Sequence, residues 1–268
     1  LQEHKYISTE SGTVNKWSVV PTSKGIYYYD LLNKSFMVFS GQIGSISDTK
    51  SMHSYFISNT ELEGLKIDNP LIKQGISSGY DQINKDIFMT FHRNNKPFTI
   101  SYNEARNQFI SFYDYLPSMY ISKGQYFITT NPNLKSLYRQ YAGNYNNFYG
   151  INYPSYVILN VNPEADLDTV FDNIMYKSEV YLNDIDQPDK TLTGVRLYSE
   201  YQDSGLIPLT VGRNSNLRRK FRDWNAILPR NQGSRERIRN PWVKLVLQFD
   251  NTSNYKLILH DIVVSYSV

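Results

Sequence analysis

The chain of 268 residues contains no cysteine, which excludes a disulfide framework and any metal site built on thiolates. No apolar run approaches the roughly 20 residues that span a bilayer, so we expect no membrane span. The N-terminus lacks a signal-peptide pattern, and helix-favouring runs of alanine, glutamate and leucine are scarce. The sequence must therefore be stabilised by a hydrophobic core that is poor in helix.

Aromatic residues are abundant instead, with 23 tyrosines and 13 phenylalanines. Aromatic side chains are enriched in strands, so the composition predicts an all-β fold. The length allows one large or two ordinary domains. We expect two, residues 1–150 and 151–268, because a segment rich in Asn, Tyr and Gly at 143–150 is followed by Tyr153-Pro154.

A short pattern recurs in the first half of the chain: an Asx residue, Lys or Asn four positions later, and an apolar residue two further on. It begins at Asp30, Asp81 and Asn103, and more loosely at Asn131, with spacings of 51, 22 and 28 residues. An Asx side chain accepts a bond from a backbone N–H two residues on, so each copy predicts a hairpin turn. Repeated hairpins are typical of propeller blades, and we expect Asp30 and Asp81 to occupy equivalent turns.

Four hairpins make about two blades, whereas a closed propeller has about four or more. The sequence thus predicts a partial β-propeller whose missing blades come from elsewhere, since open blade edges would expose unpaired backbone groups. Leu1 and Val268 both lie in strand-like runs, so we expect this sequence to be part of a longer chain with a further N-terminal portion.

The second half has longer strand candidates without helices between them. They cover residues 156–161, 169–181, 191–201, 242–249 and 256–268. Antiparallel strands in this arrangement predict a β-sandwich or jelly-roll-like domain.

Catalytic and metal-binding patterns are weak. Gly75-Ile-Ser77-Ser-Gly79 matches a nucleophile elbow but lacks the strand before it and the helix after it, and it is interpreted as a flexible loop. The four histidines have no metal-binding spacing, and the acidic segments lack the glycine and final glutamate of a calcium loop. Those residues are His4, His53, His92 and His260, with Asp166, Asp168, Asp172, Asn183, Asp184, Asp186 and Asp189. We expect no catalytic residues, no cofactor and no metal.

Positive charge is concentrated near the C-terminal end. Residues 213–239 hold nine basic and two acidic residues, a net charge of +7. The whole chain has 28 basic and 25 acidic residues, so the residues outside this stretch hold 19 basic and 23 acidic ones, a net charge of −4. The basic residues are Arg213, Arg218, Arg219, Lys220, Arg222, Arg230, Arg235, Arg237 and Arg239. Three interpretations stay open: a subunit interface, a solvated loop, and a nucleic-acid contact in which Phe221, Trp224 and Trp242 pack beside the cations.

Short motifs over nearly the whole chain, in this order, resemble those of a known family: Trp17-Ser-Val-Val-Pro21, Gly25-Ile-Tyr-Tyr-Tyr-Asp30, Ile46-Ser-Asp48, His53-Ser-Tyr-Phe56, Tyr80-Asp-Gln-Ile-Asn-Lys85, Ser101-Tyr-Asn-Glu104, Phe109-Ile-Ser-Phe-Tyr113, Ser136-Leu-Tyr138, Phe221-Arg-Asp-Trp224, Pro229-Arg230, Arg235-Glu-Arg-Ile-Arg-Asn-Pro-Trp242 and His260-Asp-Ile262. The family is that of the muzzle, or stabilisation, proteins of crAss-like bacteriophages, and the chain is similar to their C-terminal part.

The resemblance implies a nozzle-like virion structural protein rather than an enzyme. It implies a sixfold ring of copies at the distal end of the phage tail, contacts with other tail proteins, and transient contact with DNA leaving through the central channel. Two alternatives stay open on the residues. One is a host glycan-binding module with exposed Tyr and Trp as stacking platforms, and the other is a propeller glycosidase with paired carboxylates.

Overall fold

The computed structural model describes residues 7–93, 96–164, 166–212 and 215–268. Strands make up 47% of the chain and helices 8%, which confirms the all-β prediction. The chain divides into two compact units, residues 1–142 and 143–268. The division lies at the start of the Asn/Tyr/Gly-rich segment 143–150, eight residues before the predicted boundary at 150.

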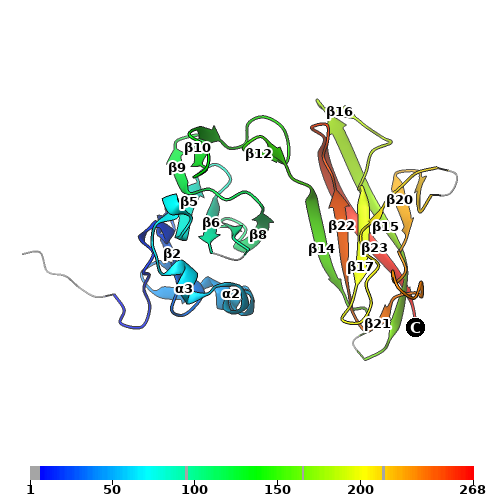
Figure 1. Cartoon of the computed structure of the whole chain (residues 1–268), viewed down its shortest axis with the longest axis horizontal. Helices are drawn as coiled ribbons and strands as arrows, with labels where there is room; N and C mark the ends of the chain where they lie inside the picture. Colours follow the sequence, from blue (N-terminus) through cyan, green and yellow to red (C-terminus); the bar gives the residue numbers. More distant parts are fainter. Residues whose placement is uncertain (1–6, 94–95, 165, 213–214) are drawn as a thin grey trace, which may run out of the picture. The chain divides into compact units, whose positions relative to one another are not determined.

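The first unit contains three antiparallel sheets in which each strand pairs with the next one along the chain (Figure 1). The first sheet consists of β1 (Val20–Pro21), β2 (Ile26–Asp30), β3 (Ser35–Phe39) and β4 (Ile43–Ser45). The second consists of β5 (Gly75–Asp81), β6 (Asp86–His92), β7 (Phe98–Asn103) and β8 (Gln108–Tyr113). The third consists of β9 (Met119–Lys123), β10 (Tyr126–Thr130) and β11 (Leu137–Arg139).

These sheets stack through aromatic side chains. Phe36 of the first sheet meets Tyr102 of the second at 5.6 Å between ring centroids, and Phe88 of the second meets Phe127 of the third at 5.2 Å. Strands β5, β6 and β7 are buried almost throughout because the second sheet is covered on both faces. Because both faces are covered, even the polar residues Thr90, Thr99 and Ser101 of these strands are buried.

The predicted equivalence of the turns at Asp30 and Asp81 is wrong. Asp30 lies between the second and third strands of its sheet, whereas Asp81 lies between the first and second strands of the next sheet. Successive turns of a meander lie at opposite ends of its strands, so the two turns do not occupy equivalent positions. The recurring pattern follows from the chemistry of a tight turn and does not mark one position in a repeating unit.

Short helices join the first two sheets. They are α1 (Ile46–Thr49), α2 (His53–Asn59) and α3 (Leu62–Leu65), followed by the 3₁₀ turn η2 (Pro70–Ile72). The cap is Ser45, and Ser51, with φ of 56°, separates α1 from α2. A further 3₁₀ turn, η1 (Lys16–Ser18), precedes β1. No helix in the described ranges is long and apolar enough to cross a membrane.

The second unit packs two antiparallel sheets around one hydrophobic core (Figure 1). One sheet has the order β14 (Ser155–Val161), β22 (Val243–Phe249), β17 (Gly194–Tyr198), β18 (Ile207–Pro208). In the other, β15 (Thr169–Leu182) pairs with β16 (Ile185–Asp186), β20 (Asp223–Ile227), β21 (Arg239–Asn240) and β23 (Lys256–Ser267), and β19 (Leu217–Lys220) pairs with β20. A small hairpin, β12 (Asn147–Phe148) and β13 (Ile151–Asn152), precedes them. Each of the five strand candidates of the second half contains a strand.

Candidate interface surfaces

The basic residues of the stretch 218–239 all lie on the surface of the second unit. Arg218, Arg219 and Lys220 lie on β19, Arg222 lies in the turn to β20, Arg230, Arg235 and Arg237 lie in the following loop, and Arg239 begins β21. Every one of these side chains is exposed. Arg213 lies outside the described residues. The stretch therefore presents its cations to solvent or to a partner.

Few of these cations have acidic partners. Arg237 is paired with Asp172, with 2.7 Å between Nη1 and Oδ1. In the part of the chain that the structure describes, no other member of the set has a carboxylate within 4.0 Å. Arg219 lies over the ring of Trp224, 5.4 Å from its centroid, and donates to the carbonyl oxygen of Pro188. The surface is thus largely uncompensated within its own unit.

The structure divides the basic stretch between two recesses. Arg219 and Arg222 border a recess of about 220 Å³ together with Lys177, Glu179 and Asp186. Arg237 and Arg239 border another, of about 600 Å³, in which Asp168 and Glu236 also take part. Carboxylates stand among the cations in both recesses. A continuous phosphate backbone would be repelled by them, so this arrangement favours a protein partner over nucleic acid.

The aromatic residues near the cations differ sharply in exposure. Trp224 is only 2% exposed and belongs to the core, so it offers no free ring face to a sugar or a base. Trp242 is half-buried. Phe221, by contrast, is 87% exposed at the turn between β19 and β20, and its φ is 60°. Periodicity could not reveal this hairpin because its strand β19 is mostly charged.

The four repeated Asx residues bond to turns. Asp30 Oδ1 accepts from the N–H of Leu32 at 3.1 Å and of Asn33 at 3.0 Å, and Asp81 Oδ1 accepts from Ile83 N–H at 3.0 Å. Asn103 Oδ1 accepts from Arg106 N–H at 2.7 Å, and Asn131 Oδ1 accepts from Asn133 N–H at 2.9 Å. Burial by itself would raise the pKa of Asp30, but hydrogen bonds from Asn33, Gly12 and Ser11 outweigh it and lower that pKa. These carboxylates and amides stabilise turns.

Ser77 is not in a flexible loop, as the motif suggested, but is buried within β5. Its Oγ donates to the carbonyl of Pro117 at 2.9 Å and lies 3.2 Å from His92 Nε2. Burial lowers the pKa of His92 to about 4. A serine–histidine contact alone resembles part of a hydrolase site, but this strand does not turn into a helix after Ser77, so the elbow that would present a nucleophile is missing.

His53 and His260 each lie near a single carboxylate. His53 Nδ1 is 2.7 Å from Asp48 Oδ1, and His260 Nε2 is 3.3 Å from Glu179 Oε2. His4 lies outside the described residues. Over the described ranges, no group of three or more His, Asp or Glu side chains is arranged to hold a metal ion.

Comparisons with known proteins agree with the division into two units. Residues 1–133 match the family model described as Crassvirus muzzle protein, and residues 143–231 match that of the Crassvirus muzzle protein C-terminal domain. The chain is 30% identical over 267 residues to the muzzle protein of Bacteroides phage crAss001. That match covers 98% of this chain and 19% of the relative, so the chain spans about a fifth of the relative's length.

Proposed function

This chain belongs to the crassvirus muzzle protein family, a family of phage virion structural proteins, and we propose that it acts through contacts between subunits at the distal end of the tail. In this proposal several copies, six by our expectation, form a ring around the channel through which DNA leaves. The chain contributes surfaces for assembly and carries out no catalysis. Other tail proteins bind the same ring.

The exposed cations of the second unit are the observation that carries this proposal. Eight of them are exposed, only Arg237 is paired with a carboxylate in the described part of the chain, and acidic residues stand beside them. A mixed surface of this kind suits a protein partner of mixed charge, because each isolated ion can find a counterion across the contact. The rest of the chain is net negative, so a second copy provides suitable partners.

We further propose that the three stacked sheets of the first unit are blades of a propeller, and that the two sheets of the second unit form a β-sandwich. The outer face of the third sheet supports the first part, because Ile121, Tyr126 and Leu137 are exposed there. In a propeller such a face is covered by the next blade. The relative is about five times longer than this chain, so the additional blades would come from other parts of a muzzle protein.

A reconstruction of the tail from purified virions tests the proposal. We expect a closed ring of copies at the tail's distal end, with the second unit in contact with a neighbouring subunit. Observing a single copy per tail, or finding residues 218–239 in solvent with no neighbour, would contradict it.

Charge reversal gives a second test in solution. Arg235→Glu with Arg239→Glu should weaken association, whereas Lys66→Glu with Lys135→Glu, on exposed positions of the first unit, serves as the matched control. If DNA rather than protein is the partner, duplex DNA will bind the unmodified chain with an affinity that falls steeply with salt.

A further inference from the structure

The tip of the β19–β20 hairpin has two energetically unfavourable features, one in its backbone conformation and one in the exposure of its side chain. Its turn has only two residues, and of these Phe221 alone has a positive φ, 60°. A two-residue hairpin turn of this form has a strong preference for glycine at that position. The ring of Phe221 is also 87% exposed. Backbone strain together with an exposed aromatic ring is an outlier of the kind found at functional sites.

The residues beside Phe221 give the tip its chemistry. Lys220 and Arg222 are both exposed, and neither has a carboxylate within 4.0 Å among the described residues. The tip is therefore an aromatic side chain between two free cations. Aromatic and arginine residues in this combination are enriched among the anchor residues of protein interfaces.

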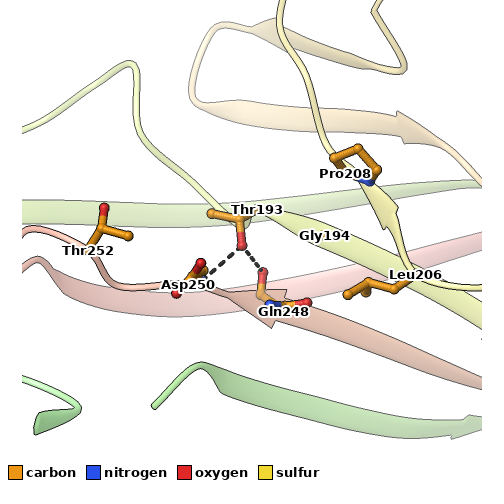
Figure 2. A pocket seen from close by; sticks show the side chains of 7 residues that line it. All are labelled: Thr193, Gly194, Leu206, Pro208, Gln248, Asp250 and Thr252. Carbon is orange, nitrogen blue, oxygen red and sulfur yellow. Dashed lines mark hydrogen bonds between the residues drawn. The ribbon is translucent and has the colours of Figure 1, made fainter. Parts of the chain in front are cut away.

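A recess that fits such an anchor lies on the other sheet of the same unit (Figure 2). It has a volume of about 360 Å³ and is lined by Thr193, Gly194, Leu206, Pro208, Gln248, Asp250 and Thr252. Gly194 leaves its floor open, since an added Cβ would lie 3.2 Å from Leu206 Cδ1. Leu206, 48% exposed, and Pro208 supply apolar walls.

Two acceptors of this recess lack partners in the described part of the chain. Gln248 Oε1 is buried without a hydrogen bond, and the exposed side chain of Asp250 has no ion pair. The main chain around them is already satisfied, because Thr193 Oγ1 accepts from Asp250 N–H at 2.9 Å and lies 3.3 Å from the carbonyl oxygen of Gln248 (Figure 2). Of the two acceptors, the exposed Asp250 carboxylate is the one that a cation from outside can reach.

We propose that Phe221 of one copy inserts into this recess on a second copy of the chain. Lys220 or Arg222 then pairs with the Asp250 carboxylate of that copy. The proposal rests on the proposed function and names the contact between its subunits. Charge complementarity selects the second copy: the tip is cationic, and the recess offers the exposed Asp250 carboxylate.

The symmetry of this contact follows from the positions of its two parts. The tip belongs to the sheet that contains β15, and the recess belongs to the sheet that contains β17 and β22. Two different surface patches meet, so the contact is head-to-tail and closes into a ring if the rotation allows it. Phe221 cannot fill the recess of its own unit while it is so exposed.

Disulfide cross-linking tests the contact directly, because the chain has no native cysteine. Lys220→Cys, which keeps Phe221 and Arg222, combined with Thr252→Cys should give, on mild oxidation, a ladder of covalent dimers, trimers and larger species. Each single-cysteine variant should remain monomeric on a non-reducing gel. The absence of a ladder from the oxidised double-cysteine variant, or dimers formed by a single-cysteine variant, would overturn the head-to-tail contact.

Phe221→Gly tests whether the ring of Phe221 contributes to self-association rather than to the stability of the fold. Glycine removes the ring and suits the positive φ, so thermal stability should be unchanged or higher while the dissociation constant for self-association rises about tenfold or more. Tyr145→Ala, which removes another exposed aromatic side chain of the second unit (51%), is the matched control and should leave association unchanged. Equal association of Phe221→Gly and the unmodified chain in sedimentation experiments refutes the anchor.

A charge swap identifies the partner of the cations. Arg222→Asp or Asp250→Arg alone should weaken association, and the double variant should restore most of it. Failure to restore overturns this pairing. If the unmodified chain self-associates but is insensitive to all these variants, the inserted tip is wrong while a ring remains supported; a single copy per tail in the virion reconstruction refutes the proposed function itself.

Discussion

Replacing Gly79 by alanine should separate two of the stacked sheets of the first unit. A Cβ at this position would lie 2.2 Å from Tyr120 Cβ and 2.6 Å from Tyr120 Cγ, far inside the usual contact distance of about 3.5–4.0 Å between carbon atoms. The clash involves the first side-chain atom of Tyr120, which no rotamer change can move. The β5–β8 sheet and the β9–β11 sheet must therefore move apart by more than 1 Å, roughly, or bend locally.

The cost comes from the aromatic layer between these sheets. Phe88 meets Phe127 at 5.2 Å and Tyr120 at 6.2 Å, and a gap of about 0.5–1 Å already forfeits a quarter to a half of each contact. Overpacking substitutions cost about 1–3 kcal/mol, and we expect Gly79→Ala at the upper end, about 3 kcal/mol. For a unit of this size that corresponds to a fall in melting temperature of roughly 6–12 °C.

Differential scanning calorimetry of the chain measures this effect, since the substitution should lower the transition of the first unit and leave that of the second in place. Gly44→Ala is the matched control, because its added Cβ would come no closer than 3.9 Å to Val38 Cγ1. Tyr120→Ala should not rescue Gly79→Ala, because it keeps the clashing Cβ. If Gly79→Ala melts within about 1 °C of Gly44→Ala, the two sheets are not in the contact described, and the blade arrangement loses its main support.

Three further predictions concern buried side chains. Burial lowers the pKa of His92 to about 4, below the 6.5 of an unfolded histidine, so the unfolded chain binds the extra proton first. The free energy of unfolding should therefore fall as the pH drops from 6.5 to 4, by at most about 1.4 kcal/mol per pH unit. In His92→Gln this part of the pH dependence should disappear. The pKa of Asp30 is lowered from 3.8, so the contribution of its carboxylate to the free energy of unfolding is complete above that value and is lost as the pH falls below it. The stability difference between the unmodified chain and Asp30→Asn should therefore shrink in acid denaturation curves. A constant difference would contradict the role of the ionised form. Trp224→Ala should destabilise the second unit by about 3–5 kcal/mol in urea unfolding, because it removes a core residue, and an effect below about 1 kcal/mol would show that the ring is not buried as described.

The sequence by itself determined the local chemistry of this protein. Alternation between apolar and polar residues predicted the positions of β14, β15, β22 and β23 to within a few residues. Successive side chains of a strand point to opposite faces, so this pattern depends only on neighbouring residues. The Asx turns at Asp30, Asp81 and Asn103 were likewise legible, since an Asx bond is made within three residues. The basic stretch and its excess charge needed only counting.

Tertiary structure decided what depends on distant residues. The burial of Ser77 and of Trp224 follows from sheets and strands that pack over them, and no local pattern records such cover. The hairpin at Phe221 was hidden because charged residues occupy the exposed edge strand β19, while its pairing with β20 depends on a core formed by the whole unit. Likewise, the recess around Gly194 unites residues more than fifty positions apart, which only the folded sheet brings together.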